Sequence, residues 1–273
     1  MITVNLTTTS QRLDFCRISL TSILLQSRLP DRINLWISKE PYLRDTGIAD
    51  SEAVDQLLES LPEVGKGYVS IRWVPNTGPY RKLIPMLREA TRDDVIVTAD
   101  DDIFYGRDWL SGLLAAYEES GGKPVASRVR SKRVNFLGKK TSYIYWGLIG
   151  HSVVAKDDFI ITFGGGAVLT RSMFDEQDIA DDSFFGLAPT ADDLWYSTLL
   201  KRNKNEVEVV PELLNELHFI QHCDGLVNHN FPRVASLLHK FRVRLWDRFV
   251  GYLGVPVCGN DVAYAKIVRY FRK

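Results

Sequence analysis

The sequence predicts an α/β fold in which a mostly parallel sheet is flanked by helices and followed by a C-terminal helical segment. Three observations support this fold class. Short apolar runs alternate with stretches of helical periodicity, as βαβ units require. The run 95–97 is β-branched and apolar on both faces, which is typical of a buried parallel strand. A length of 273 residues is enough for one large α/β domain with an appendage, or for two small domains.

The first half of the chain contains four predicted strands and four predicted helices. Apolar runs bounded by turn residues predict strands at 2–6, 33–37, 69–74 and 95–99. Apolar residues at helical spacing predict helices at 13–25, 51–61, 83–90 and 109–117. We expect Ser10 to be the N-cap of the first helix, and Gly121-Gly122 to end the fourth.

The second half is less regular. The aromatic-rich stretch 134–149 predicts strands or a long loop, and 159–169 predicts a strand that is interrupted by glycines. A helix is expected at 190–200 and a last strand at 207–210. From Phe231 onward the pattern is helical and basic. We therefore divide the chain into a domain at 1–215 and a basic helical segment at 216–273.

Charge and cysteine content argue against a nucleic-acid-binding protein and against a protein built on disulfides. Lys and Arg balance Asp and Glu at 34 each, so the net charge does not favour a nucleic-acid partner. Cys16, Cys223 and Cys258 are odd in number and widely spaced, which favours a reducing compartment over a disulfide framework. The N-terminus lacks the pattern of a signal peptide, and no stretch reaches the length of a membrane span. These features lead us to expect a cytoplasmic protein.

Three consecutive carboxylates, Asp100, Asp101 and Asp102, end the apolar run of the fourth strand. Ligands bind beyond the carboxyl ends of strands in an open α/β sheet. In extended chain Asp100 and Asp102 point one way and Asp101 the other. Two carboxylates on one side repel each other unless a cation or a basic group lies between them. A hard divalent cation such as Mg²⁺ or Mn²⁺ takes oxygen ligands and often completes its shell with substrate phosphates. The alternative is a solvated acidic turn before a helix.

Two further loops carry groups suited to phosphate. Three threonines and an arginine follow the first strand: Thr7, Thr8, Thr9 and Arg12. Their hydroxyls and the N-terminus of a helix suit a nucleotide's sugar or phosphate, although most such turns only cap a helix. Arg81 and Lys82 follow the turn 76–79 and could neutralise a diphosphate. A solvated helix face is the alternative for these two cations.

Three other features could have a functional or a structural role. Gly164-Gly165-Gly166 removes side chains at successive positions, which marks either a bulge or the close approach of a ligand. Thr190 to Asp193 resembles a capping box, and the helix dipole alone favours acids there. One of Asp192 and Asp193 could instead be a general base, if burial or a neighbouring acid offsets the dipole. His218 and His222 could be metal ligands, and structural histidines are the alternative.

Together these motifs resemble those of glycosyltransferases of the GT-A fold, nearest to the inverting family-two type. They follow one another in the order of that family, over about residues 1–215: the loop with Arg12, then 78–82, 97–102, 164–166 and 191–195. The sequence departs from the family at two points. Ser38-Lys39-Glu40 stands where an acid often binds the nucleobase, and Asp192-Asp193 stands where Glu-Asp is common.

The resemblance implies transfer of a sugar from a nucleoside-diphosphate sugar to a hydroxyl of a glycan or lipid-linked acceptor, of the surface-polysaccharide or lipopolysaccharide type. Asp100 and Asp102 would hold Mn²⁺ or Mg²⁺, Asp193 would be the base and Asp192 its neighbour. His218 or His222 would match a histidine that some of these enzymes use on metal or phosphate. The donor-binding residues implied are Thr7, Thr8, Thr9, Arg12, Arg81, Lys82, Asp100, Asp101, Gly165 and Gly166.

Two alternatives stay open: a sugar nucleotidyltransferase with a similar sheet, and a non-catalytic module that binds sugar-nucleotides. The glycine-rich N-terminal loop of nucleotidyltransferases is absent, since Thr7-Thr8-Thr9-Ser10 stands there. The basic tail raises a separate question. Its cations, among them Arg269, Arg272 and Lys273, alternate with aromatic and aliphatic residues, which suits peripheral contact with an anionic membrane. The alternative is a C-terminal helix that packs its apolar face on the domain.

Overall fold

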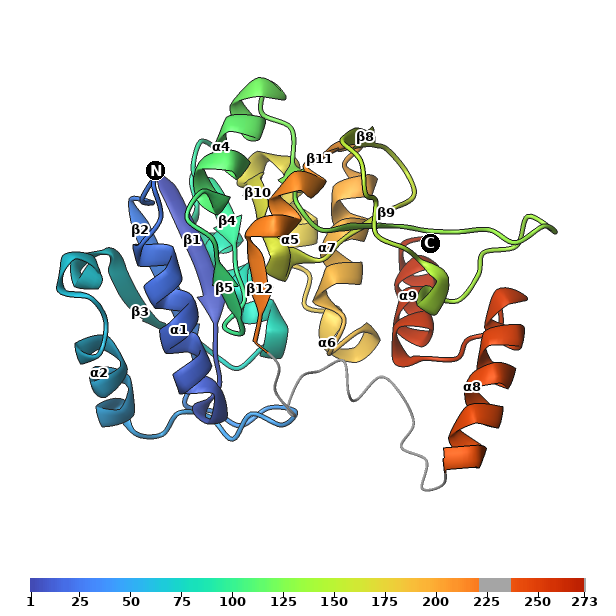
Figure 1. Ribbon diagram of the computed structural model, residues 1–273, viewed down its shortest axis with the longest axis horizontal. Helices are drawn as coiled ribbons and strands as arrows, with labels where there is room; N and C mark the ends of the chain where they lie inside the picture. The colour runs from blue at the N-terminus through green and yellow to red at the C-terminus, as the bar shows by residue number, and fades with distance from the viewer. Residues whose placement is uncertain (221–236, 273) are drawn as a thin grey trace.

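The computed structural model describes residues 1–220 and 237–272. Its centre is an eight-stranded sheet in the order β3-β2-β1-β4-β10-β6-β11-β8 (Figure 1). The first four strands pair in parallel. They are β1 (Ile2–Thr7), β2 (Arg32–Ile37), β3 (Val69–Trp73) and β4 (Val95–Thr98). The four strands predicted in the first half of the chain are therefore confirmed.

The other half of the sheet is mixed. β10 (Ala167–Thr170) runs antiparallel to β4 and to β6 (Val125–Ala126). β11 (Val207–Val209) is parallel to β6 and antiparallel to β8 (Val153–Ala155). The sheet as a whole is mostly parallel, as predicted. Two small ladders lie beside it, formed by β5 (Ile103–Tyr105) with β12 (Leu217–Phe219) and by β7 (Val129–Ser131) with β9 (Phe159–Ile161).

Helices cover both faces of the sheet because successive strand residues point to opposite sides. Ile96 thus joins one apolar cluster and Val97 the other. The cluster of Val97 is covered by α1 (Leu13–Leu24), α2 (Ser51–Glu59) and α4 (Trp109–Glu119). The cluster of Ile96 is covered by α3 (Ile84–Glu89), α5 (Glu176–Ala180), α6 (Phe184–Leu187), α7 (Asp192–Arg202) and α9 (Gly259–Phe271).

Two sequence predictions need correction or refinement. Ser10 is not the N-cap of the first helix, because it begins a 3₁₀ turn, η1 (Ser10–Arg12), and its hydroxyl hydrogen-bonds that of Thr46 at 2.9 Å. The predicted strand 159–169 divides into β9 and β10 at a 3₁₀ turn, η5 (Phe163–Gly165). The stretch 134–149 is mainly loop, with a 3₁₀ turn, η4 (Tyr143–Tyr145).

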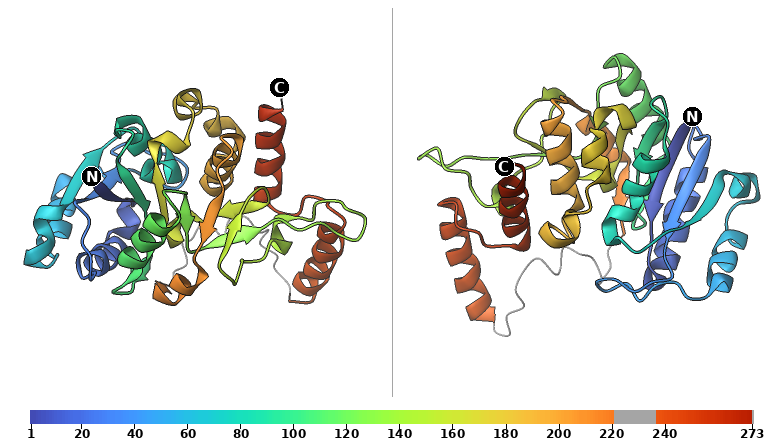
Figure 2. Two further views of the ribbon diagram at one scale, coloured as in Figure 1. Left: turned by 90° about the horizontal axis from the view of Figure 1, so that it is seen from above. Right: turned by 180° about the vertical axis from the view of Figure 1, so that it is seen from behind.

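The C-terminal part contains α8 (Leu237–Tyr252) and α9. α9 lies beside α7 and buries Ala263 and Ile267, so the packing predicted as the alternative for the tail is confirmed for this helix (Figure 2). Arg233 and Lys273 of the basic tail lie outside the described residues. Among the helices that the structure describes, none is long and apolar enough to cross a membrane.

Candidate active site at the end of strand β4

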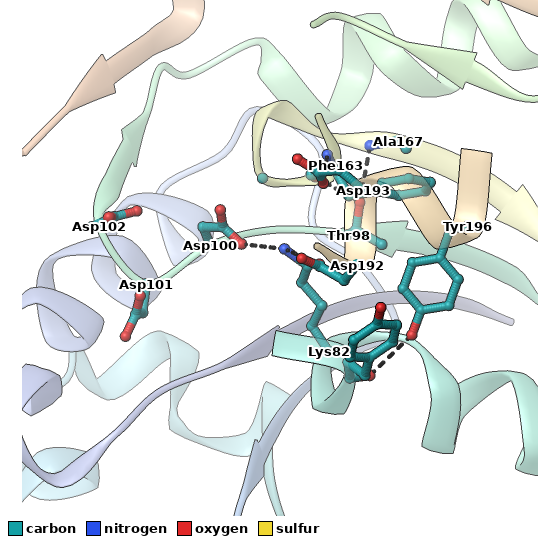
Figure 3. Close-up of polar contacts among 12 residues, drawn as sticks. Lys82, Thr98, Asp100, Asp101, Asp102, Phe163, Ala167, Asp192, Asp193 and Tyr196 are labelled. Carbon is teal, nitrogen blue, oxygen red and sulfur yellow. Dashed lines mark hydrogen bonds and ion pairs between the residues drawn. The ribbon is translucent and has the colours of Figure 1, made fainter. Parts of the chain in front are cut away.

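The acidic triplet leaves the sheet directly after β4, at the carboxyl ends of β1 and β4. Tyr105 holds the backbone of Asp100, the first residue of the triplet. The Tyr105 hydroxyl accepts a hydrogen bond from the backbone N–H of Asp100 at 2.7 Å and donates one to the carbonyl of Gly164 at 2.7 Å. In Figure 3 Asp101 points to the opposite side from Asp100 and Asp102, as the alternation of extended chain predicts.

Lys82 links the triplet to the start of α7. It ends a 3₁₀ turn, η3 (Gly78–Lys82), and its Nζ lies 2.8 Å from Oδ1 of Asp100 and 3.2 Å from Oδ2 of Asp192 (Figure 3). Burial alone would lower the pKa of Lys82, but the two carboxylates outweigh it, and the pKa is well above its ordinary value. Burial alone would likewise raise the pKa of Asp100, but Lys82 holds it below its ordinary value. Lys82 and Asp100 are therefore both charged at neutral pH.

Arg12 holds the rest of the triplet. Its guanidinium lies 2.5 Å from Oδ1 of Asp101 and 2.8 Å from Oδ2 of Asp102. The Thr8 hydroxyl donates to Oδ2 of Asp101 at 2.7 Å. Burial raises the pKa of Asp101 to about 7, against the opposing effect of Arg12 and with the support of the neighbouring Asp102. Asp101 is therefore buried and partly protonated near neutral pH, whereas Asp100 and Asp102 are half-buried and ion-paired, so the triplet is not a fully solvated acidic turn.

Asp193 faces the glycine turn. The predicted capping box is wrong, because α7 begins at Asp192 with Ala191 as N-cap, and no side chain caps it. Oδ1 of Asp193 instead accepts a hydrogen bond from the backbone N–H of Phe163 at 3.0 Å. Burial raises the pKa of Asp193 to about 7, with Asp192 adding to the rise and Lys82 opposing it. Burial and a neighbouring acid are the two effects that a general base at this helix terminus requires.

Each of the three glycines lets a different side chain pack closely against the turn: Asp100, Arg128 and Trp109. A Cβ on Gly164 would lie 1.9 Å from Oδ2 of Asp100, so only glycine fits beside this carboxylate. Gly166 has a φ of +103° and lies against the indole of Trp109. A Cβ on Gly165 would lie 2.7 Å from the Cβ of Arg128. The turn thus has a clear packing role, and donor binding by Gly165 and Gly166 stays a prediction.

The loop after β1 and the turn η3 contact each other next to the acidic triplet. The Arg81 guanidinium donates to the Thr8 carbonyl at 3.1 Å and pairs with Asp45 at 2.8 Å. Arg81 and Lys82 are 2% and 5% exposed, so the alternative of a solvated helix face is wrong. The Thr7 hydroxyl donates to the carbonyl of Trp36 at 2.7 Å. Thr9 is partly buried, and its carbonyl accepts from the N–H of Arg12 at 3.0 Å.

The structure describes only one of the two candidate histidines. His218 is exposed on β12, where it pairs with Phe104 of β5, and the rings are 6.0 Å apart. The ladder continues to Ile220, whose N–H donates to the carbonyl of Asp102 at 2.9 Å. β12 therefore runs alongside the end of the acidic triplet. His222 and Cys223 lie outside the described residues.

Arg128 is a functional candidate that belongs to none of the sequence motifs. Its charge lowers the pKa of Asp100, after the larger effect of Lys82. The guanidinium lies 4.9 Å from the ring centre of Phe219 on β12. Tyr143 lies nearby as well: burial raises its pKa to about 12, and Asp193 adds to the rise. The available signal was the basic stretch 123–140, which contains Arg128.

The charges of the site fit a divalent cation. Asp100, Asp101, Asp102, Asp192 and Asp193 form one electrostatic network, and Lys82 and Arg12 form ion pairs with four of them. Within residues 1–220 and 237–272 no group of three or more acidic, histidine or cysteine side chains could hold a metal by itself. A hard ion bound by two carboxylates and by substrate phosphates matches this donor set.

No family model matches the chain, and no curated protein sequence matches it. Among solved structures, S. aureus TarS 1-349 in complex with UDP is 12% identical, with a TM-score of 0.50 over 77% of this chain and 58% of TarS. The GDP-Man and Mn²⁺ complex of the mannosyltransferase PcManGT from Pyrobaculum calidifontis is 14% identical, with a TM-score of 0.46 over 98% of this chain and 69% of that one.

A third similar structure is the 4-diphosphocytidyl-2C-methyl-D-erythritol synthase of Anaerococcus prevotii, 14% identical, with a TM-score of 0.48 over 77% of this chain and 86% of that one. The fold neighbours are thus glycosyltransferases and a nucleotidyltransferase. This chain spans little more than half of TarS. The likeness shows a GT-A-like fold, and the fold class predicted from the sequence is confirmed.

Proposed function

We propose that this protein is a metal-dependent, inverting glycosyltransferase that moves a sugar from a nucleoside-diphosphate sugar to a hydroxyl of a glycan or lipid-linked acceptor. The observation that carries the proposal is Asp193, a half-buried carboxylate that is held by the backbone N–H of Phe163 and whose pKa is raised to about 7. A general base works best when its pKa lies near the working pH.

Asp193 would take the proton of the acceptor hydroxyl. Its Oδ1 is engaged by the N–H of Phe163, which fixes the carboxylate and leaves Oδ2 as the atom that would accept the proton. Because the base acts from the side opposite the leaving group, a single displacement inverts the anomeric centre. Asp192, on the preceding residue, would hold Lys82 in position through their 3.2 Å ion pair.

Negative charge develops on the nucleoside diphosphate as it leaves. Lys82 and Arg12 are the two cations paired with the acidic triplet, so both lie where this charge would form. Asp100 and Asp102 would hold the divalent ion, which when bound supplies Lewis-acid neutralisation of the diphosphate. Each of these carboxylates is already oriented, Asp100 by Lys82 and Asp102 by Arg12.

The two proposed roles belong to two successive parts of the chain. Residues 1–215 would bind the nucleotide-sugar and carry out the chemistry, and residues 216–273 would serve the acceptor side. Tyr143 and Arg130 lie between the two parts. The Arg130 guanidinium lies 5.4 Å from the ring centre of Tyr143, and Ser142 and Tyr143 both donate hydrogen bonds to Asp261 of α9. We propose a cytoplasmic role in surface-polysaccharide or lipopolysaccharide synthesis.

A panel of nucleotide-sugars tests the proposal. Each compound is added with Mn²⁺, and thermal unfolding is followed, because a ligand that binds only the native state stabilises it. The donor found in this way is then incubated with candidate acceptors. Release of free nucleoside diphosphate is expected. Release of pyrophosphate would indicate nucleotidyl transfer, and binding with no turnover on any acceptor would indicate a non-catalytic module.

A further inference from the structure

Apolar side chains are concentrated on the surface of two segments that lie outside the candidate site. The loop 132–141 exposes Val134, Phe136 and Leu137, and α8 exposes Leu245, Trp246 and Phe249. All six side chains are between 58% and 78% exposed. Large clustered apolar side chains on a surface mark an interaction site far more often than single ones do.

The loop and α8 are held together as one unit. The Asn135 side chain donates to the Tyr252 carbonyl at 3.0 Å, the Ser142 N–H donates to the Gly251 carbonyl at 2.9 Å, and the Tyr145 hydroxyl donates to the Arg248 carbonyl at 2.6 Å. The ring of Phe136 also stacks on that of Tyr252, with centres 6.3 Å apart. Figures 1 and 2 show both segments at the end of the molecule opposite β3 and α2.

We call this region the loop–α8 surface. Its members are Val134, Phe136, Leu137, Leu245, Trp246, Phe249 and Tyr252. It differs from the neighbouring α9, which buries Ala263 and Ile267 against the domain. Of the two helices in the tail, α9 therefore packs against the domain, and α8 exposes aromatic residues.

Positive charge surrounds the loop–α8 surface. The loop itself carries cations and no acid, and α8 adds Arg248; the loop cations are Lys132, Arg133, Lys139 and Lys140. Nζ of Lys132 and of Lys140 lie 4.9 Å and 5.8 Å from the ring centre of Tyr264.

Few acids lie near this surface among the described residues. The pKa of Lys201 reflects the nearby cations: burial lowers it to about 6, Lys132 and Lys140 lower it further, and Asp158 opposes them. The carboxylate of Asp261 accepts hydrogen bonds from Ser142 and from the backbone N–H of Tyr143, and Asp247 is the only acid among the described side chains of α8. Among the described residues, the cations beside the apolar groups therefore outnumber the acids.

We propose that the loop–α8 surface docks the protein on an anionic lipid membrane, with Phe136, Leu137, Trp246 and Phe249 inserted at the depth of the headgroups. Aromatic and aliphatic groups beside cations are what interfacial binding requires. A second copy of the chain fits less well, because a two-fold contact through this surface would bring the two sets of cations together. The surface extends the contact that the sequence predicts for the basic tail, and it includes none of the candidate active-site residues.

Vesicle sedimentation tests the proposal on the full chain without nucleotide or metal. We expect binding to vesicles of phosphatidylcholine and phosphatidylglycerol in equal parts, little binding to phosphatidylcholine alone, and weaker binding at higher salt. The double variants Phe136→Ser/Leu137→Ser and Trp246→Ser/Phe249→Ser should each bind at least about tenfold more weakly, because each removes two large apolar groups from the contact. Lys139→Gln with Lys140→Gln should weaken binding to anionic vesicles only.

Leu25→Ser is the matched control, since Leu25 is 59% exposed at the end of α1 and Leu137 is 58% exposed. It should bind vesicles as the wild type does, and all variants should keep the wild-type unfolding temperature. Equal binding to neutral and anionic vesicles, or an equal loss in Leu25→Ser, would overturn the proposal. A dimer seen by light scattering that the apolar double variants abolish, with no vesicle binding, would assign the surface to a second copy instead.

Discussion

Nζ of Lys82 lies 2.8 Å from Oδ1 of Asp100, although Lys82 belongs to a 3₁₀ turn and Asp100 to the end of a strand. The same Nζ reaches Asp192 at the start of α7. One ammonium group therefore sets the spacing between the proposed metal-binding and base-bearing segments.

Replacing Lys82 should affect the fold as well as the site. Lys82→Gln leaves the buried Asp192 and the half-buried Asp100 without their shared cation, and breaking a buried pair such as Lys82–Asp192 costs about 3–5 kcal/mol. Lys66→Gln is the control, since Lys66 pairs with the exposed Glu63 at 2.8 Å, a type of contact worth about 0–1 kcal/mol. Urea unfolding measures both. Equal losses in the two variants would mean that the Lys82 bridge does not stabilise the fold.

Asp193→Asn should lower turnover by about 10²-fold or more while donor affinity stays nearly unchanged. The amide oxygen can still accept the hydrogen bond from Phe163, so the substitution removes basicity and little else. Steady-state kinetics and donor titration measure the two effects. In Asp192→Asn the ion pair with Lys82 is lost, so donor binding should weaken more than turnover. If Asp192→Asn is instead the variant that loses turnover, Asp192 is the base.

The pKa of Asp193 and that of Asp101 are both raised to about 7, which gives stability a definite pH dependence. Between about pH 4 and 7 the folded state keeps protons that the unfolded chain releases, so the free energy of unfolding falls as pH rises through this range. Without divalent ions, the unfolding temperature should therefore be higher at pH 5 than at pH 8. At pH 8 Asp193→Asn should raise it by at least about 2 °C. An unchanged pH dependence in that variant would contradict this account.

Activity should follow the opposite trend. The proposed base must be deprotonated, so kcat/KM should rise with pH and level off above about pH 7. A profile that levels off near pH 4 would show that Asp193 keeps an ordinary pKa.

Removing a proposed metal ligand should abolish the response to the ion. In Asp102→Ala, Mn²⁺-dependent donor binding should disappear, because Asp102 is one of two carboxylates assigned to the ion. Asp55→Ala, at an exposed position of α2, should keep the full Mn²⁺-dependent shift in unfolding temperature. Undiminished Mn²⁺-dependent binding in Asp102→Ala would remove the basis for the metal assignment.

Gly164→Ala should disturb the site without replacing a charged residue. The added Cβ would lie 1.9 Å from Oδ2 of Asp100 and force that carboxylate away from Lys82. Misplacement by about 1 Å can lower turnover by about 10²-fold. A Cβ on Gly67 meets nothing within 4 Å, so Gly67→Ala should retain full activity. Wild-type turnover in Gly164→Ala would mean that the position of Asp100 is not critical.

Much of the fold follows from local pattern. β1 to β4 and their helices are long enough for periodicity to be visible, and each was predicted within about two residues at its ends. β6 has two residues, Val125 and Ala126, and β5, β7, β8 and β12 have three each. Runs this short carry no measurable alternation, which explains why they were missed.

The sequence names candidate residues for the site, but it does not predict the contacts between them. The sequence identifies Asp100 and Lys82 as polar residues next to a strand and a turn, but it does not bring them together. Their pairing depends on packing between elements that are distant in the chain, as does the burial that raises the pKa of Asp193. The role of Arg128 was missed for the same reason, because its effect on Asp100 arises only in the folded state.

The position of β10 in the sheet has a consequence for synthesis. β4 is paired on one side by β1, but its other side is paired by β10, which begins 69 residues after Thr98. At about 5–20 residues per second a ribosome needs roughly 3 to 14 seconds to make that interval. Until then Val95, Ile96 and Val97 lie on an open, β-branched edge of the kind that recruits other strands. The tendency of the nascent chain to aggregate is thus governed by the speed of translation between β4 and β10, and codon choice over residues 99–166 becomes a determinant of expression yield.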